Sequence, residues 1–315
     1  MASNKQEHKN ISLELGDTSM DARLGVYYID MREARVHYDA NLYGGGFDVN
    51  GVPLCLNGKN QPLYFPINIL QYGFILHAEY TKEQSQAKLN SMLACLRQLE
   101  ILKTENTETC AWYHLEEEEK YHIPPPWASG MAQGEAISFY LRLYQITNDQ
   151  RLLESAKKAY AFLKVDFKDG GVRRRDAGGN LWFEEYPTQV PTFVLNGFIY
   201  TLFGLYDLYR VTKDPEVYKD IQECLKTLEV NLPRFDAGYW SYYDLRDREL
   251  VRYYYQKNVH VLQLDVLYEL TDNDLFKRYA DRWRKTLNPF NFIVVQLMYR
   301  IWPRWQKLNS LLSGR

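Results

Sequence analysis

The chain has 315 residues, of which 46% are hydrophobic, so it can bury the core of one large domain. Its 38 basic and 40 acidic residues give a net charge of −2. A charge this close to zero provides no global field that favours nucleic acid or an anionic membrane, and we expect no nucleic-acid partner.

The cysteines and the apolar segments exclude further classes of protein. Cys55, Cys95, Cys110 and Cys224 form no Cys-x-x-Cys pair, which argues against a zinc site, and a chain of this length needs no disulfide framework. The polar start "MASNKQEHKN" does not resemble a signal peptide, and no stretch reaches the roughly 18 apolar residues of a membrane span. Aromatic residues make up 15%, which suits packing between helices or stacking on sugar-like ligands.

Residues 1–65 are predicted to form an N-terminal extension that contains a β-hairpin. Residues 1–22 are polar and are expected to be loosely held. Residues 25–38 are rich in Val, Ile and Tyr and predict one or two strands. The stretch "GGGFDVNGVPL" that follows contains the pair Asn50-Gly51, which is typical of a hairpin turn.

Residues 66–290 show helical periodicity and are predicted to form the catalytic domain. Three helix pairs are expected at 131–147 with 151–163, at 193–211 with 215–230, and at 260–270 with 274–287. Their joints "ITNDQRLLESA", "VTKDPEVYKDI" and "LTDNDLFKRYA" each end one helix at Thr and cap the next with Asp or Asn. Stacked hairpins of this kind predict a mainly α fold, an incomplete α/α toroid, with the long loops 110–130, 164–192 and 231–258 as walls of its cleft.

Residues 291–315 form a tail that mixes Ile, Val, Leu, Trp and Phe with Arg and Lys, as in "NFIVVQLMYRIWPRWQKL". Such an amphipathic segment either docks on its own domain or lies on a membrane surface or a partner. The sequence leaves these interpretations open.

The first candidate site lies in "FEEYPTQVPTFVLNGF", where a proline-rich turn precedes an apolar helix. Glu184 and Glu185 lie between Trp182, Phe183 and Pro187, so partial burial is expected. Burial raises the pKa of a carboxyl group toward the range of a general base, whereas two adjacent acids at the surface are simply solvated. Neither a Walker-type glycine loop nor a His-Glu-x-x-His motif appears in the chain.

Two further stretches carry polar groups. In "YWSYYDLRDREL", Tyr243 and Arg246 flank Asp244, and the arginine either grips a ligand carboxylate through its planar fork or forms an ordinary surface pair. In "RYYYQKNVHVLQL", the tyrosines at 253–255 cannot all face the core, so at least one should point into the cleft. His260 in the same stretch is more typical of a hydrogen-bonded core histidine.

Several blocks together resemble the glucuronyl C5-epimerases, the enzymes that modify heparosan in heparan sulfate synthesis. In the family's order they are "GVPL", "YFPINILQYG", "WASGMAQGEAIS", "EEYPT", "FVLNGFIYTLFGLYDL", "YDLR", "HVLQL" and "FKRYADRWRKTL", and they span residues 51–287. The resemblance implies inversion of C5 in D-glucuronic acid residues of a heparosan-like polysaccharide to give L-iduronic acid. A base removes the proton from C5, next to the carboxylate, and an acid returns one on the opposite face.

The resemblance also implies the residue roles. Glu185 in "EEYPT" transfers a proton, Tyr243 in "YDLR" is catalytic, and Arg246 in the same block clamps the substrate carboxylate. The family's second proton carrier is a tyrosine that precedes the "H..QL" helix; a one-residue shift of the match places it on Tyr255, with Tyr254 as the alternative. The matching blocks further imply that sugar contacts involve these residues: Tyr72, Gln133, Tyr186, Asn196, Tyr254 and His260.

One departure from the family shapes the remaining expectations. The animal enzymes carry a β-rich middle domain, whereas residues 72–127 here read as helix plus loop. We therefore expect no metal and no cofactor. The short form, together with the polar N-terminus, suggests a bacterial, cytoplasmic enzyme, either free or peripheral to the inner membrane through its tail. Both a monomer and a homodimer remain open.

Other functions fit parts of the pattern. A polysaccharide lyase would share the first step and then expel the C4 substituent. A glycoside hydrolase would need two carboxylates across the bond, for which Glu184 or Glu185 with Asp244 are candidates. A non-catalytic glycan-binding protein would lose only binding when Glu185 is replaced.

Overall fold

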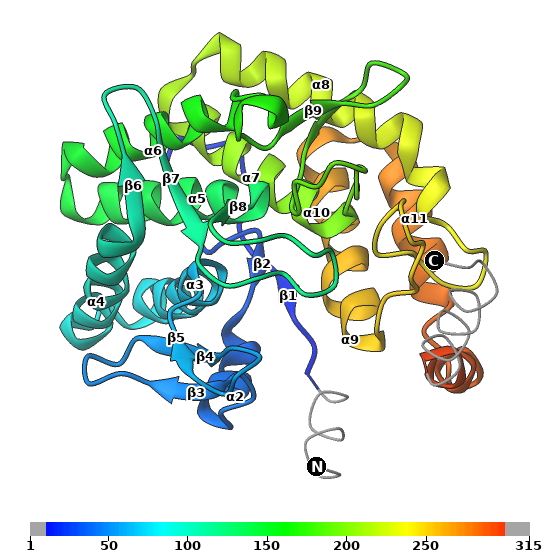
Figure 1. Ribbon diagram of the computed structural model, residues 1–315, viewed down its shortest axis with the longest axis horizontal. Coiled ribbons are helices and arrows are strands. Elements are labelled where there is room, and N and C mark those ends of the chain that lie inside the picture. The colour runs from blue at the N-terminus through cyan, green and yellow to red at the C-terminus, as the bar shows by residue number, and fades with distance from the viewer. Residues whose placement is uncertain (1–10, 300–315) are drawn as a thin grey trace.

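The computed structural model describes residues 11–299, and its framework is four consecutive helix hairpins (Figure 1). The hairpins are α3 (Pro66–Glu83) with α4 (Gln86–Leu102), α5 (Gly130–Thr147) with α6 (Gln150–Leu163), α7 (Leu195–Thr212) with α8 (Pro215–Asn231), and α10 (Val261–Thr271) with α11 (Asp274–Lys285). The three predicted helix pairs and the mainly α class are confirmed.

The three later hairpins share one joint, which explains their repeated sequence. In the second hairpin, Asn148 is left-handed with φ 56°, and Asp149 donates its backbone N–H to Thr147 Oγ1 at 3.3 Å. The Asp149 carboxylate in turn caps α6 by accepting the N–H of Arg151 at 3.0 Å. The same bonds recur at Thr212 with Asp214 and at Thr271 with Asn273. The predicted caps are therefore confirmed.

The first helix of each hairpin, α3, α5, α7 and α10, belongs to the interior of the fold. The second helix of each, α4, α6, α8 and α11, packs against the first. Helices α5 and α7 approach closely because Gly134 and Gly204 face each other, and a Cβ on Gly204 would overlap the Gly134 carbonyl oxygen. The series continues to α10, where the Gln263 amide donates to the carbonyl of Asn196 at the start of α7, at 3.0 Å.

An antiparallel ribbon of β1 (Glu14–Leu15) and β2 (Ile29–Asp30) completes the arrangement. It contacts α10, and β2 also contacts α3, so it lies between the last and the first inner helices of the series. Leu13 donates its N–H to Asn258 at 2.9 Å, and Asp17 accepts from Arg210 at 2.7 Å. The expectation that residues 1–22 are loosely held is therefore wrong for residues 11–22, while residues 1–10 lie outside the described part.

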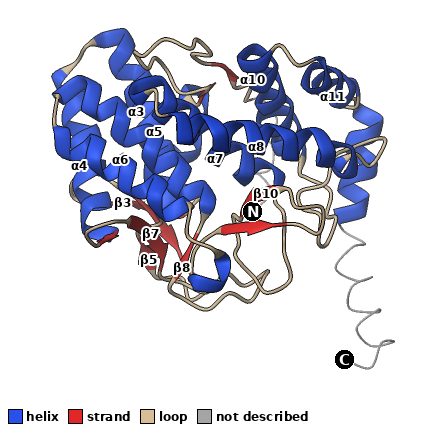
Figure 2. Cartoon of the chain, turned by 90° about the horizontal axis from the view of Figure 1, so that it is seen from above, coloured by secondary structure: helices blue, strands red, loops and turns tan. Residues whose placement is uncertain are grey.

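The remaining strands are short, and Figure 2 shows labelled members of them on one side of the helices. The predicted hairpin is confirmed as β3 (Gly44–Phe47) with β4 (Pro53–Leu56), and β5 (Pro62–Leu63) adds a third strand. The other sheets are β6 (Lys103–Glu105), β7 (Cys110–His114) and β8 (Trp127–Ala128), and β9 (Arg173–Arg175) with β10 (Leu181–Phe183).

Two local predictions need correction. In residues 25–38, only β2 is a strand; the chain then turns through a 3-10 helix, Arg32–Ala34, into the short helix α2 (Arg35–Asp39). Tyr27, Tyr28 and Ile29 are buried in succession rather than in alternation, so the β propensity of this stretch is overridden by packing. In the loop expected at residues 110–130, both ends instead form strands, β7 and β8, of the β6–β7–β8 sheet. The predicted domain boundaries stay a prediction.

The first part of the tail packs on its own domain. Residues 289–299 are helical, and Val295 is buried in a cluster with Trp240 and Val251. Residues 300–315 of the predicted tail lie outside the described residues. Among residues 11–299, no helix has the length and apolar character needed to cross a membrane.

Candidate active site

A cavity of about 220 Å³ opens where the three long loops meet. Tyr121 comes from the first loop, Tyr186 from the second, and Tyr243 and Tyr255 from the third loop and the helix start after it. Charged groups from the same loops complete the wall: Glu118, Lys120, Glu249 and Arg252. The loops predicted to wall the cleft do so around this cavity.

Glu185 lies directly behind this wall, two residues after β10 ends at Phe183. Its side chain is 4% exposed, and its Oε1 accepts a hydrogen bond from Tyr243 Oη at 3.1 Å. Within residues 11–299, Oε2 has no hydrogen-bond partner. Burial raises the pKa of Glu185 to about 7, since the hydrogen bonds of Tyr186 and Tyr243 offset the desolvation of the charged form only in part.

The first turn of α7 is shaped around this carboxylate. A Cβ at Gly197 would overlap Glu185 Oε2, so only glycine lets the side chain rest on the helix. The sequence "VLNGF" therefore combines a buried apolar helix with a gap that is filled by the acid. This explains why the proline-rich turn is anchored against an apolar helix.

The neighbouring acid, Glu184, has a different task. It is 1% exposed; its Oε2 accepts from Thr192 Oγ1 at 2.9 Å and from the Phe193 N–H at 3.1 Å, and Arg174 lies 3.5 Å from Oε1. Phe193 has φ 50°, a strained value for this residue type, and the bond to Glu184 helps to hold it. Glu184 thus fixes the turn that presents Glu185.

Tyrosine hydroxyls surround the cavity side of Glu185. Tyr243 Oη also lies 3.4 Å from Tyr186 Oη, and the rings of Tyr243 and Tyr255 meet edge to face with centroids 6.2 Å apart. Burial and the nearby Glu185 charge both raise the pKa of Tyr243 and of Tyr186 well above the ordinary value, so these phenols stay protonated at neutral pH. The site therefore connects one buried carboxyl group to phenols at the cavity.

The three consecutive tyrosines diverge, as the sequence required. They form α9 (Tyr253–Tyr255), and the chain continues through a π-helix, Gln256–His260, into α10. Tyr253 packs against Trp240, with ring centroids 6.1 Å apart, and Tyr254 against His37 at 5.3 Å. Of the three tyrosines, Tyr255 lines the cavity.

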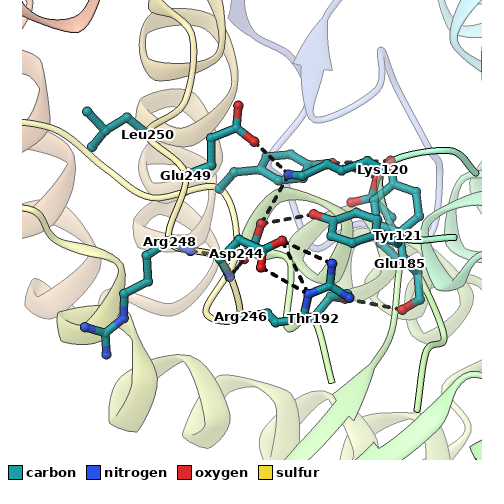
Figure 3. A network of polar contacts seen from close by, with 12 residues as sticks. Lys120, Tyr121, Glu185, Thr192, Asp244, Arg246, Arg248, Glu249 and Leu250 are labelled. Atoms are coloured by element: carbon teal, nitrogen blue, oxygen red, sulfur yellow. Dashed lines mark hydrogen bonds and ion pairs between the residues drawn. The ribbon is translucent and has the colours of Figure 1, made fainter. Parts of the chain in front are cut away.

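The positively charged side chains around the cavity differ in whether a carboxylate neutralises them (Figure 3). Lys120 lies 2.8 Å from Glu249 and 3.4 Å from Asp244. Within residues 11–299, Arg252 has no carboxylate partner; its guanidinium lies over the Tyr299 ring at 5.7 Å. Arg252 is therefore the cation of the cavity wall whose charge is not yet neutralised.

Arg246, which the resemblance implied as the clamp, lies beside the cavity rather than on its wall. Its guanidinium pairs with Asp247 at 3.1 Å and lies over the ring of Tyr121 at 4.5 Å, on the far side of a residue that does line the cavity. Asp244 is fully buried and accepts from Tyr121 Oη at 3.0 Å and from the Asp247 N–H at 2.6 Å. Asp244 organises this loop, and its hydrogen-bonding capacity is used within it.

Two of the residues predicted as sugar contacts, Gln133 and His260, have hydrogen-bond partners within the fold. The Gln133 amide donates to the carbonyls of Trp112 and Ser129, each at 3.0 Å, and accepts from the Trp112 N–H, so both ends bind backbone. His260 is fully buried with Nδ1 2.8 Å from Ser241 Oγ, and burial lowers its pKa to about 3. Neither side chain lines the cavity.

Asn196 and Tyr72 are also set back from the cavity. Asn196 is 2% exposed, and within residues 11–299 its Oδ1 has no partner. Tyr72 packs against Tyr38 and Phe47, with ring centroids 4.9 and 5.3 Å away. The structure therefore brings Glu185, Tyr186, Tyr243 and Tyr255 together. Asn196 and Tyr72 lie away from the cavity wall.

Sequence reasoning missed Lys120, Tyr121, Arg252 and Glu135. Arg252 adjoins the tyrosine triplet, which could have drawn attention to it, whereas Lys120 ends a run of acids that looks like solvated surface. Glu135 on α5 is fully buried, accepts from Gln71 at 3.1 Å, and has its pKa raised well above the ordinary value by burial. Across residues 11–299, no group of three or more His, Cys, Asp or Glu side chains could hold a metal ion.

Comparison with known sequences decides the family. The profile described as "D-glucuronyl C5-epimerase C-terminus" matches residues 107–285, which is more than half of the chain and includes Glu185 and the residues that line the cavity apart from Tyr299. The chain belongs to the D-glucuronyl C5-epimerase family. Over 184 residues it is 39% identical to a protein named D-glucuronyl C5-epimerase from Caenorhabditis elegans, which covers 53% of this chain and 30% of that protein.

A second protein similar to this chain has no activity in its name. An uncharacterized protein of Methanocaldococcus jannaschii is 30% identical over 183 residues, which cover 57% of this chain and 59% of the relative. The chain thus spans less than two thirds of either relative's length.

Solved structures agree on the fold. Cellobiose 2-epimerase from Spirochaeta thermophila superimposes with a TM-score of 0.55 at 13% identity, covering 80% of this chain and 66% of that one. The GH76A α-1,6-mannanase from Salegentibacter sp. gives 0.52 at 15% identity, covering 82% and 70%. The helix hairpins of this epimerase-family chain are thus an α/α toroid, and identities this low support nothing beyond the architecture.

Proposed function

We propose that the protein inverts C5 of D-glucuronic acid residues within a heparosan-like polysaccharide, giving L-iduronic acid residues. The observation that carries this proposal is the hydrogen bond from Tyr243 Oη to Glu185 Oε1, which joins a carboxyl group of pKa about 7 to a phenol on the cavity wall. A proton-transfer group is most effective when its pKa lies near the working pH. Family membership adds support for this reaction.

The proposal assigns the proton steps to Glu185 and to two tyrosines of the cavity wall. Ionised Glu185 accepts the Tyr243 proton, and the Tyr243 oxygen takes the proton from C5 as the C–H electron pair moves toward the substrate carboxylate. The resulting enolate-like intermediate then receives a proton at C5 from Tyr255 on the opposite face. One turnover therefore leaves Glu185 protonated and Tyr255 as a phenolate. A proton passes back from Glu185 to Tyr255 through solvent in the cavity, which restores both groups for the next turnover.

The intermediate concentrates negative charge on the substrate carboxylate, so a cation must face it. Arg252 has the support of the geometry, because it lines the cavity beside Tyr255 and has no carboxylate partner within residues 11–299. Arg246 has the support of the family motif, but its charge is already paired with Asp247. We therefore favour Arg252 as the residue that binds the substrate carboxylate.

Replacement of Arg252 by Ala should lower kcat/KM by about 10- to 100-fold, as expected for the loss of a charge-assisted hydrogen bond. Arg246→Ala should have the smaller effect, because it removes a group that stacks on Tyr121 rather than one that faces the cavity. Initial rates of C5 exchange for both variants make the comparison. A larger loss in Arg246→Ala would return the clamp to the residue in the family motif.

The reaction itself is tested by incubation with a polymer that contains glucuronate, in deuterated water. Epimerisation should introduce deuterium at C5 and give both uronic acid isomers by NMR. A lyase would instead produce an unsaturated sugar that absorbs ultraviolet light. Failure of the wild-type protein to exchange the C5 hydrogen of any glucuronate polymer, with binding intact, would favour the non-catalytic glycan-binding alternative.

A further inference from the structure

A second cavity, of about 340 Å³, adjoins the candidate active site. The two cavities share Glu249, Leu250 and Tyr299 as wall residues, so they lie on either side of one short chain segment. Aromatic rings of Tyr239 and Tyr242 line the second cavity, and the Tyr239 side chain is exposed. Rings of this kind stack on the apolar faces of sugars.

Arg248 gives this second cavity an unneutralised positive charge. Its backbone N–H is held by Asp244 Oδ1 at 3.3 Å, with φ 51°, so the start of the side chain is fixed in direction. Figure 3 shows the Arg248 side chain extending away from the Asp244 network. Within residues 11–299, its guanidinium has no hydrogen bond or ion pair. The side chain is exposed and lines the cavity.

The acids beside Arg248 do not cancel its charge, because each is already engaged. Asp247 pairs with Arg246 at 3.1 Å, and Glu249 pairs with Lys120 at 2.8 Å. The guanidinium of Arg248 is therefore available to an anionic ligand, whose carboxylate or sulfate group it can bind with two parallel hydrogen bonds.

We propose that the second cavity is a subsite for a further uronic acid residue of the same polymer, with Arg248 binding its carboxylate. This inference rests on the proposed function, since a polymer that places one residue in the active site must continue along the protein on at least one side. Because the two cavities share a wall at Leu250, a polymer held in the first cavity needs to cross only this short segment to reach the second. The two tyrosine rings and the free arginine match a uronic acid polymer rather than a neutral glycan.

The test compares wild type with Arg248→Ala and Arg248→Lys on a glucuronate polymer, by calorimetric binding and by exchange kinetics. Arg248→Ala should weaken polymer binding and raise KM by about three- to tenfold with kcat unchanged, and Arg248→Lys should recover part of the loss. Binding of the same polymer after reduction of its carboxylates to alcohols should be equally weak in all three proteins. Arg151→Ala is the matched control, because Arg151 is exposed and pairs with Asp149 at the start of α6.

The outcomes separate this inference from the proposed function. If the wild type exchanges the C5 hydrogen and Arg248→Ala binds and turns over the polymer as the wild type does, the subsite is wrong and the reaction stands. An equal loss in Arg151→Ala would also refute the subsite, because it would show a non-specific effect of surface charge. If the wild type shows no exchange while Arg248→Ala still weakens binding, the reaction is wrong and the anion site stands.

Discussion

Glu185→Gln and Tyr255→Phe are each expected to lose C5 deuterium exchange by about 100- to 10,000-fold while keeping the fold. Glutamine fits the space on Gly197 and can still accept the Tyr243 hydrogen bond, but it cannot take up a proton. Phenylalanine keeps the ring of Tyr255 against Tyr243 and removes only the hydroxyl. The measurement is NMR of a glucuronate polymer in deuterated water, with circular dichroism to check the fold.

The tyrosine triplet provides its own controls. Tyr253→Phe should keep wild-type exchange, because Tyr253 packs against Trp240 outside the cavity. Tyr254→Phe should also retain most of it, since Tyr254 packs against the core rather than lining the cavity. If Tyr254→Phe lost exchange and Tyr255→Phe did not, the proton carrier would be the alternative residue. Full exchange in both Glu185→Gln and Tyr255→Phe would refute the site.

The helix hairpins could be predicted because their determinants are local. Each joint is specified within three residues, as at Thr147, Asn148 and Asp149, where a left-handed residue and a cap end one helix and begin the next. The ribbon that closes the arrangement could not be predicted in this way. The hydrogen-bond partner of Leu13 is Asn258, 245 positions along the chain, and that of Asp17 is Arg210, 193 positions along. A polar N-terminus gives no sign of contacts so distant in sequence.

The candidate site divides along the same line. Glu185 could be predicted as a site residue because its aromatic and proline neighbours indicate burial. The structure brings it together with Tyr243 and Tyr186. The direction of a long side chain on a loop has no such signal. Arg246 and Arg252 look alike in sequence, yet the fold pairs one with Asp247 and leaves the other on the cavity wall.

The proposed role of Glu185 also has a consequence for stability. Its pKa is about 7 in the folded protein and near the ordinary 4.5 when unfolded, so the folded state binds more protons between these values. The free energy of unfolding should therefore fall as pH rises from about 4.5 to 7 and level off above that. The shift corresponds to about 3 kcal/mol at pH 8. Ionised Glu185, the form that accepts a proton in the reaction, is thus the form that weakens the fold.

Glu185→Gln should remove this dependence, because glutamine does not titrate. Relative to wild type, its free energy of unfolding should rise by about 3 kcal/mol between pH 4.5 and pH 8, as measured by urea denaturation at several pH values. Other buried acids such as Glu135 are present in both proteins, so their titration largely cancels in the difference. Glu154→Gln, at an exposed position on α6, should show no such trend.

A difference between wild type and Glu185→Gln that stays constant with pH would mean that Glu185 has an ordinary pKa, and would remove the physical basis for its role near neutral pH. A trend of the expected sign, together with an acid limb of kcat/KM near pH 7, would tie the instability and the chemistry to the same carboxyl group.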